Sequence, residues 1–179
     1  MDKSGYWADN YQQNRLPIDK AIGRIKSGQR VFIGSYCGEP QCLVKGLADA
    51  SLNFTDLEII RLFSAESTSL SQIADRSRSQ NLNIRSFYLG SANSESFKGD
   101  LRFITPINLS AIHRLIKSRL LPIQVALIQV TPPDDFGWMS LGISVDITAS
   151  AAAAADIVIA QVNRKMPRVQ GRGNIHVND

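Results

Sequence analysis

The chain has 179 residues, of which 44% are hydrophobic and 20% are charged, and its formal net charge is +4. This composition is typical of one globular domain with a hydrophobic core. The basic residues are scattered along the chain, whereas a nucleic-acid-binding surface needs a basic stripe interleaved with aromatic residues. We therefore expect no nucleic-acid partner.

The cysteine count and the N-terminal residues bear on whether the protein binds a metal, forms disulfides, or is exported. Cys37 and Cys42 are too few for a four-ligand structural zinc site or for a disulfide framework, so we expect free, mostly buried thiols and no metal. The N-terminus lacks the pattern of a secretion signal, and no apolar run reaches the length of a membrane span. These features favour a cytoplasmic protein without a membrane partner.

Residues 1–16 are mostly polar, and we interpret them as an N-terminal arm that is partly helical and packs against another surface. A second subunit in a homodimer is one candidate for that surface. The aromatic residues of the arm are Tyr6, Trp7 and Tyr11. Pro17 suits the first turn of a helix, which Ser27 and Gly28 should end.

An apolar segment followed by a glycine-bearing turn comes next. Residues 30–34 are rich in β-prone apolar side chains, which predicts a strand that is buried on both faces. Gly34 and Gly38 let the backbone bend tightly and approach a ligand, and Pro40 suits the start of a helix. Because open α/β sheets bind ligands where their strands end, this turn is a candidate binding site.

Strand and helix patterns alternate along the rest of the chain. We expect strands over residues 57–63, 81–89, 101–105, 125–130, 138–145, 157–162 and 175–177. We expect helices over residues 107–121 and 148–156, a serine-rich loop at 64–71, and shorter helices near 73–74 and 92–97. The alternation predicts one α/β domain over residues 17–179, with an open, largely parallel sheet covered by helices on both faces.

Three blocks of the sequence, residues 31–41, 121–146 and 157–177, carry a family resemblance. Together they are similar to the N-terminal domain of the acetyl-CoA hydrolase/transferase family, of the class I CoA-transferase superfamily, and especially to its 4-hydroxybutyrate CoA-transferase branch. The resemblance implies the CoA-transferase (NagB/RpiA-like) fold and, as substrates, an acyl-CoA and a short carboxylic acid. Family members usually carry aspartate where Gln124 stands, a departure that bears on the substrate more than on the fold.

The resemblance also implies a mechanism. In this family a glutamate attacks the acyl-CoA thioester, and CoA passes through a glutamyl-CoA thioester to the acceptor acid. That glutamate belongs to a C-terminal domain that we expect to lie outside this chain. The chain would then be the N-terminal half of the enzyme, without a catalytic residue and inactive alone. Two alternatives stay open, an acyl-CoA (acetyl-CoA) hydrolase and a non-catalytic acyl-CoA-related binding module.

The candidate substrate-binding residues lie on the glycine turn, on a proline-containing loop and after a strand. They are Gly34, Ser35, Cys37, Gly38, Glu39, Pro40, Gln41, Pro132, Pro133, Asp134, Gly137 and Asn163. The turn's N–H groups and the Gln41 amide would hold a carboxylate or carbonyl oxygen, although the turn could simply require glycine. Asp134 is equally suited to cap its own backbone. Glu39 is disfavoured as a nucleophile because a helix N-terminus makes it weakly basic and the family places the nucleophile elsewhere.

Two further groups of residues have a functional and a simpler interpretation. Arg164, Lys165 and Arg168 would either meet the phosphates of CoA or form a solvated surface, and the solvated surface is the simpler account. His113 lies beside the apolar face of the helix predicted at 107–121, and we interpret it as a surface or edge histidine.

Overall fold

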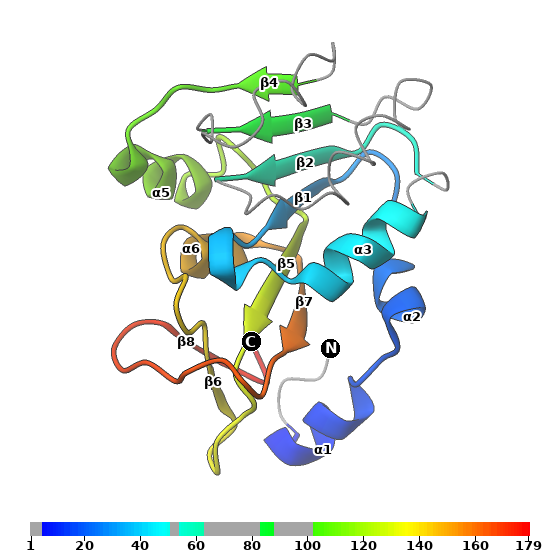
Figure 1. The fold of residues 1–179 in the computed structure, drawn as a ribbon, viewed down its shortest axis with the longest axis vertical. Helices are drawn as coiled ribbons and strands as arrows, with labels where there is room; N and C mark the ends of the chain where they lie inside the picture. The colour runs from blue at the N-terminus through cyan, green and yellow to red at the C-terminus, as the bar shows by residue number, and fades with distance from the viewer. Residues whose placement is uncertain (1–4, 51–53, 63–82, 88–101) are drawn as a thin grey trace.

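A six-stranded parallel sheet runs through the computed structural model, which describes residues 5–50, 54–62, 83–87 and 102–179 (Figure 1). The strand order is β4-β3-β2-β1-β5-β7, and every neighbouring pair is parallel. The strands are β1 (Arg30–Ile33), β2 (Glu58–Arg61), β3 (Asn83–Ser86), β4 (Arg102–Ile104), β5 (Val125–Val130) and β7 (Ile157–Val162). The predicted loop at 64–71 and the short helices near 73–74 and 92–97 lie outside the described residues.

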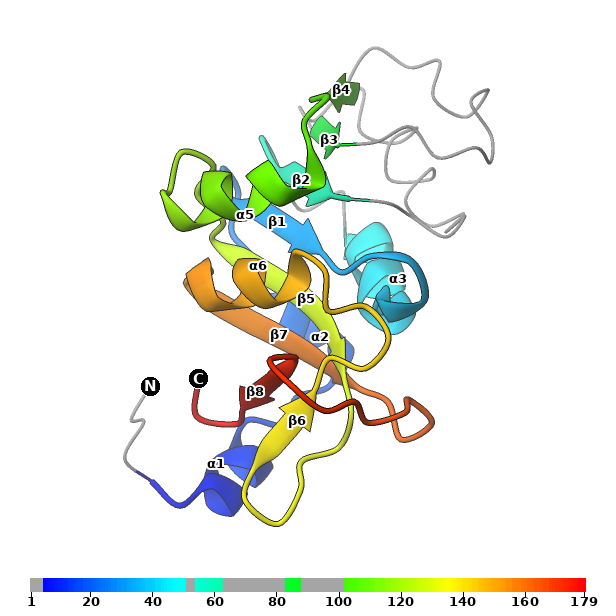
Figure 2. The ribbon, with the colours of Figure 1, turned by 90° about the vertical axis from the view of Figure 1, so that its left-hand side faces the viewer.

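Helices cover both faces of this sheet. They are α2 (Ile18–Ile22), α3 (Gln41–Ala50), α5 (Leu109–Lys117) and α6 (Thr148–Ala154). Helices α2 and α3 share one layer of the core with the sheet, and α5 and α6 share the other (Figure 2). The predicted α/β fold, with a parallel sheet covered on both faces, is therefore confirmed. In the described segments no helix is both long and apolar enough to cross a bilayer.

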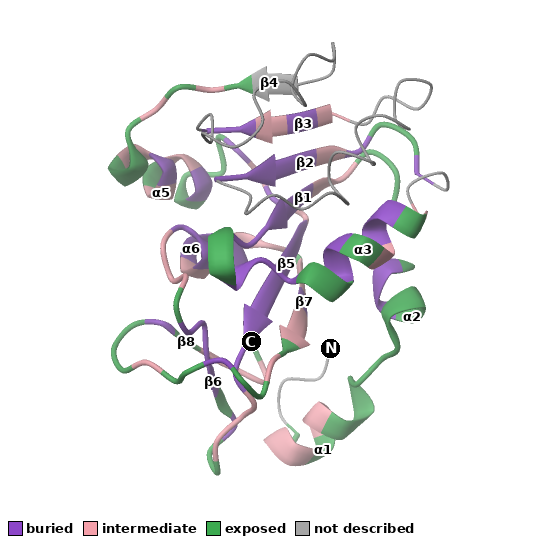
Figure 3. Cartoon of the chain, in the orientation of Figure 1, coloured by how far each residue is buried: buried purple, intermediate pink, exposed green. Residues whose placement is uncertain are grey.

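Strand β1 shows how the sequence produces two core layers. Successive side chains of a strand point to opposite faces, so Val31 and Ile33 enter the layer with α2 and α3, while Phe32 enters the layer with α5 and α6. All three are at most 1% exposed. Strand β5 is buried at every position, and Figure 3 shows the buried class running along both strands. The near-continuous apolar runs are thus those of a doubly covered parallel sheet.

A separate antiparallel ribbon joins β6 (Trp138–Ser140) to β8 (Asn174–His176). The sequence predicted a longer strand over 138–145, but the strand ends at Ser140. Gly142 has a φ of +62°, and a side chain at this position would collide with Met166. The chain therefore turns directly after β6, because glycine permits a conformation and a close approach that another residue would resist.

The N-terminal arm contains α1 (Trp7–Gln13), which packs against this ribbon rather than against the main sheet. The Trp7 ring covers Gly137, where an added Cβ would lie 2.7 Å from the Trp7 Cγ. The Asn10 Nδ2 donates to the Asn178 Oδ1 at 2.9 Å. The predicted helical arm thus finds a packing surface on its own domain.

Two expectations about individual elements were wrong. Cys37 and Cys42 are free but exposed, not buried. Position 42 lies opposite the stripe of α3 that carries Leu43, Val44 and Leu47, so the helix turns its thiol to solvent. The helix after Pro17 is also shorter than expected. It ends at Ile22 with Gly23 as its C-cap, before the expected end at Ser27 and Gly28.

Candidate functional site

The turn that follows β1 is built from backbone hydrogen bonds and one strained residue. The Gly34 N–H donates to the Leu127 carbonyl of β5 at 2.9 Å, which extends the ladder beyond β1. The short 3₁₀ helix η1 (Tyr36–Gly38) follows, closed by the Gly38 N–H to the Ser35 carbonyl. Tyr36 has a φ of +48°, which is uncommon for a residue with a side chain. Such strain persists only where the surroundings fix it, and it is concentrated at functional sites.

Ser35 is fully buried, and its Oγ has no hydrogen-bond partner in the part of the chain that the structure describes. Buried hydroxyl groups are nearly always paired, so an unpaired one requires an explanation. Its place at the carboxyl end of β1 is where ligands of open α/β sheets bind. The hydroxyl is therefore a candidate ligand contact.

Gly38 brings this turn against the segment that follows β6. A Cβ on Gly38 would lie 2.6 Å from the Cβ of Ser144, so no other residue fits without a shift. Glu39 is 2% exposed and accepts a hydrogen bond from the Gln41 Nε2 at 3.1 Å. From the sequence we expected the Gln41 amide to hold a substrate oxygen. In the structure this amide donates to the neighbouring Glu39 side chain. The Pro40 carbonyl accepts the Val44 N–H and starts α3.

A largely apolar pocket of about 380 Å³ opens beside η1. Four segments that are distant in sequence form its wall. The lining residues are Tyr36, Cys37, Leu62, Leu109, Ile143, Ser144, Val145 and Asp146. Tyr36 and Ile143 are 47% and 54% exposed, so their apolar surfaces remain available to another molecule. This pocket can accept an apolar group at the carboxyl edge of the sheet.

The sequence did not single out two polar residues that the structure places at the same edge. Gln129 on β5 is 7% exposed and donates from its Nε2 to the Cys37 carbonyl at 3.2 Å. Its Oε1 accepts from the Asn163 Nδ2, which ties this predicted site residue to the turn. Arg61, the last residue of β2, is 6% exposed and donates from its Nε to the Ser86 Oγ. The sequence offered one signal for such residues, a polar side chain inside an apolar strand, as for Gln129, or at its end, as for Arg61.

The loop between β5 and β6 contains the remaining predicted site residues, and its distal part projects away from η1 (Figures 1 and 2). The Asp134 Oδ1 accepts the Phe136 and Trp138 N–H groups, as the capping interpretation expected. Its Oδ2 lies 2.7 Å from the Arg168 Nη2. Partial burial acts to raise the pKa of Asp134, but these hydrogen bonds and the Arg168 charge lower it below the ordinary 3.8. Asp134 and Arg168 therefore fasten the loop.

Two other predicted residues of this loop have structural surroundings. Pro132 contributes its carbonyl to Arg168, which donates from Nη1 at 3.4 Å. Pro133 is half-buried and precedes Asp134. Gly137 is covered by Trp7 and lies beside His176, so its lack of a side chain is needed for packing of the arm. Of the predicted residues outside the Gly34–Gln41 turn, Asn163 is thus linked to that turn through Gln129. Asp134 and Gly137, in the distal part of the β5–β6 loop, have packing roles.

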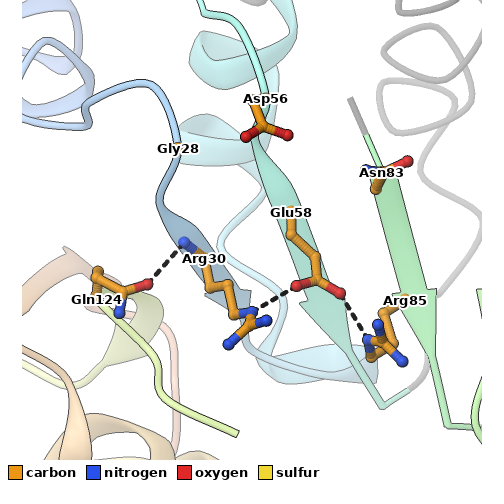
Figure 4. A pocket seen from close by; sticks show the side chains of 7 residues that line it. All are labelled: Gly28, Arg30, Asp56, Glu58, Asn83, Arg85 and Gln124. Atoms are coloured by element: carbon orange, nitrogen blue, oxygen red, sulfur yellow. Dashed lines mark hydrogen bonds and ion pairs between the residues drawn. The ribbon is translucent and has the colours of Figure 1, made fainter. Parts of the chain in front are cut away.

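A second pocket, of about 440 Å³, lies at the opposite, amino-terminal edge of the sheet (Figure 4). Its lining residues are Gly28, Arg30, Asp56, Glu58, Asn83, Arg85 and Gln124. The Glu58 carboxylate lies 2.5 Å from the Arg30 Nε and 2.6 Å from the Arg85 Nε. Burial acts to raise the pKa of Glu58, but both arginine hydrogen bonds outweigh it and lower the pKa. These contacts join three adjacent strands.

Comparison with known sequences identifies close relatives. The model of the acetyl-CoA hydrolase/transferase N-terminal domain matches residues 1–179. The chain is 31% identical over 173 residues to the 4-hydroxybutyrate coenzyme A transferase of Clostridium kluyveri, covering 97% of this chain and 40% of that protein. It is 32% identical over 190 residues to the succinyl-CoA:acetate/propanoyl-CoA:succinate CoA transferase of Fasciola hepatica, covering 99% of this chain and 39% of that protein. The chain thus spans about 40% of the length of these relatives.

Comparison with solved structures gives the same fold. The crystal structure of RipA from Yersinia pestis superposes with a TM-score of 0.85 at 24% sequence identity, over 99% of this chain and 42% of that one. At this identity the likeness establishes the fold and not the activity. The match of the family model over the whole length carries the assignment, and the chain belongs to the acetyl-CoA hydrolase/transferase family as its N-terminal domain.

Proposed function

We propose that this chain is the N-terminal half of an enzyme that moves CoA between an acyl-CoA and a carboxylic acid. The curated relatives named above are CoA transferases. The observation that carries the proposal is the apolar pocket beside η1, at the carboxyl edge where α/β sheets bind their ligands. An acyl chain is an apolar group that this pocket would shelter from water.

In this proposal the residues of the turn bind and orient the substrate. Tyr36, Leu109 and Ile143 contact the acyl chain through their exposed apolar surfaces. The buried Ser35 hydroxyl donates to a carbonyl or carboxylate oxygen that reaches the end of β1. The chain is divided into an arm over residues 1–16 and the substrate-binding domain over 17–179.

The covalent chemistry belongs to a C-terminal domain that this chain does not include. There a glutamate carboxylate attacks the thioester carbonyl and expels CoA as a thiolate, which gives a mixed anhydride. The thiolate then attacks the glutamyl carbonyl, releases the acid and forms the glutamyl-CoA thioester. An acceptor carboxylate takes the place of the first acid, and the same steps run in reverse. Hydrolysis would follow if water, in place of the acceptor carboxylate, attacked the glutamyl-CoA thioester, which would release CoA and restore the glutamate carboxylate.

Binding of an acyl-CoA to the purified chain tests the role of the pocket. Calorimetric titration with butyryl-CoA should give weaker binding after Ile143→Asp, by about tenfold or more, because a carboxylate replaces an apolar wall of the pocket. Leu120→Asp, at a position 77% exposed and outside the pocket lining, is the matched control and should bind like the original chain. Equal affinities of the two variants would contradict the proposed site.

Activity measurements test whether this chain binds the substrate while a C-terminal domain performs the covalent chemistry. The chain alone should show no acyl-CoA turnover, because the nucleophile is expected elsewhere. A longer protein with the C-terminal domain should form a glutamyl-CoA adduct that mass spectrometry detects. Thioester loss without an acceptor acid in that protein would favour the hydrolase, and absence of any adduct would favour the non-catalytic binding module.

A further inference from the structure

Three amide side chains connect the carboxyl ends of β5 and β7 to η1 and to the first turn of α3, and we call them the amide relay. They are Gln129, Gln161 and Asn163. The Gln129 Oε1 accepts from the Gln161 Nε2 at 3.3 Å and from the Asn163 Nδ2 at 3.0 Å. The Gln161 Oε1 in turn accepts the backbone N–H of Cys42 at 2.9 Å. The relay therefore ends on backbone groups, at Cys37, at Cys42 and, through the Asn163 Oδ1 that accepts the Lys165 N–H at 2.9 Å, at Lys165.

These backbone ends fix the orientation of the amides. The Cys42 N–H can only donate, so the Gln161 oxygen must face it and the Gln161 NH₂ group must face Gln129. The Gln129 oxygen then lies toward two donors, and its NH₂ group lies toward the Cys37 carbonyl, which can only accept. A flip of Gln129 would oppose donor to donor and acceptor to acceptor. The relay has one consistent arrangement.

The relay holds both ends of a short segment that contains the η1–α3 junction. Cys37 is the central residue of η1 and lines the apolar pocket. Cys42 is the second residue of α3, where a helix N–H has no partner within the helix, so Gln161 acts as a cap supplied by β7. The Gln129 amide is nearly inaccessible and already bonded on both sides, so it is not placed to bind a ligand itself.

We infer that Gln129 is a positioning residue for the apolar pocket. It holds the Cys37 carbonyl directly and the start of α3 through Gln161, and it thereby fixes the Tyr36–Gly38 turn in the wall of the pocket. This role rests on the proposed function of the pocket. It explains how the strained φ of Tyr36 is maintained, since the carbonyl of the following residue is held from the neighbouring strand.

Two substitutions separate this role from general stability. Gln129→Met keeps the approximate size of the side chain but removes both the donor and the acceptors. Gln129→Glu is sensitive to pH, because a neutral carboxylic acid can donate to the Cys37 carbonyl and accept from its amide neighbours, whereas an ionised one cannot donate. The readout is amide hydrogen exchange of Gly38, Glu39 and Cys42, compared with amides of β1.

We expect Gln129→Met to speed exchange of these three amides about fivefold relative to β1 at every pH, as loss of a buried hydrogen bond implies. Gln129→Glu should match the original chain at acid pH and approach Gln129→Met as the pH rises and the carboxyl ionises. Ile159→Val, a core change on β7 outside the relay, should leave the ratio unchanged. Unchanged ratios in Gln129→Met, or an equal change in Ile159→Val, would overturn the inference.

Butyryl-CoA affinity, measured on the same proteins, distinguishes the two claims. Weaker binding by Gln129→Met, and by Gln129→Glu only where its exchange is fast, is the result expected for a positioning residue. If the original chain fails to bind while the exchange pattern appears, the proposed function fails and the hydrogen-bond relay stands. If Gln129→Met binds normally despite faster exchange, the positioning role fails and the proposed function stands.

Discussion

Glu58 lies on β2 between Arg30 of β1 and Arg85 of β3, with a side chain that is 16% exposed. Because both guanidinium groups donate to it, the carboxylate is favoured in the ionised form and its pKa is lowered from the ordinary 4.5. A lowered folded-state pKa adds stability above the unfolded pKa, and that stability is lost as the pH falls through the folded pKa.

Glu58→Gln should lower the free energy of unfolding by about 1–2 kcal/mol at neutral pH, because two charge-assisted hydrogen bonds are weakened inside a half-buried cluster. The loss should shrink as the pH falls below the ordinary 4.5, where the carboxyl of the unfolded chain takes up a proton, and should be smallest below the lowered folded-state pKa, where the folded carboxyl is neutral as well. Urea unfolding over this pH range measures both effects. Asp135→Asn, at an exposed position, is the control, and a pH-independent loss would contradict the role of the charge.

At the level of residues, local chemistry was predictable and partner identity was not. The sequence could suggest that Asp134 caps its own backbone, because the donors follow within four residues. It could not show that Gln129 reaches the Cys37 carbonyl, which is 92 positions away in sequence. The thiols were wrongly expected to be buried because cysteine is usually buried, whereas exposure depends on the face of α3 and η1 that each one occupies.

Among the elements, the central strands were the most predictable. The predicted bounds 125–130 and 157–162 coincide with β5 and β7. Each of these segments has five apolar residues and one glutamine, which allows little choice of ends. Helix ends depended on features beyond periodicity: the helix predicted at 107–121 is shortened to Leu109–Lys117, and Arg119 adopts a φ of +57° just after it. The family match supports the fold, but it does not indicate which residues are bonded to one another.

The contact between α1 and the β6–β8 ribbon can be tested at Gly137. Gly137→Ala adds a Cβ 2.7 Å from the Trp7 Cγ at a φ of +85°, so it suffers both backbone strain and a clash. Gly28→Ala is a matched control, because Gly28 has a φ of +79° and open space around an added Cβ. Backbone strain should destabilise both variants by about 1 kcal/mol.

Only Gly137→Ala should also displace Trp7, which a change in tryptophan fluorescence, recorded with Trp138 replaced by Phe in both variants, and a further stability loss of about 1 kcal/mol would reveal. The difference between the two unfolding free energies therefore measures the packing of the arm. If the two variants lose the same free energy of unfolding and the fluorescence of Trp7 is unchanged, the arm can move aside without destabilising the protein. This contact would then not fix the arm.

For the whole molecule, the alternation of strands and helices predicted the class but not the pairing of strands. The sequence suggested that all the strands contribute to a largely parallel arrangement, whereas β6 and β8 pair with each other in a separate antiparallel ribbon. This division follows from contacts between distant segments, such as Trp138 opposite His176. It places the arm and ribbon at one end of the molecule, while the apolar pocket lies beside η1 (Figure 1).

This division predicts that the main sheet folds without the arm. Helix α1 has no fully buried residue, and its contacts described above are with the ribbon and the end of the chain. Removal of residues 1–16 should therefore leave cooperative unfolding and far-ultraviolet circular dichroism close to those of the full chain. Amide exchange in β6 and β8 should become faster, while exchange in β1 and β5 stays slow. Loss of protection in β1 and β5 would instead show that the arm is an integral part of the domain core.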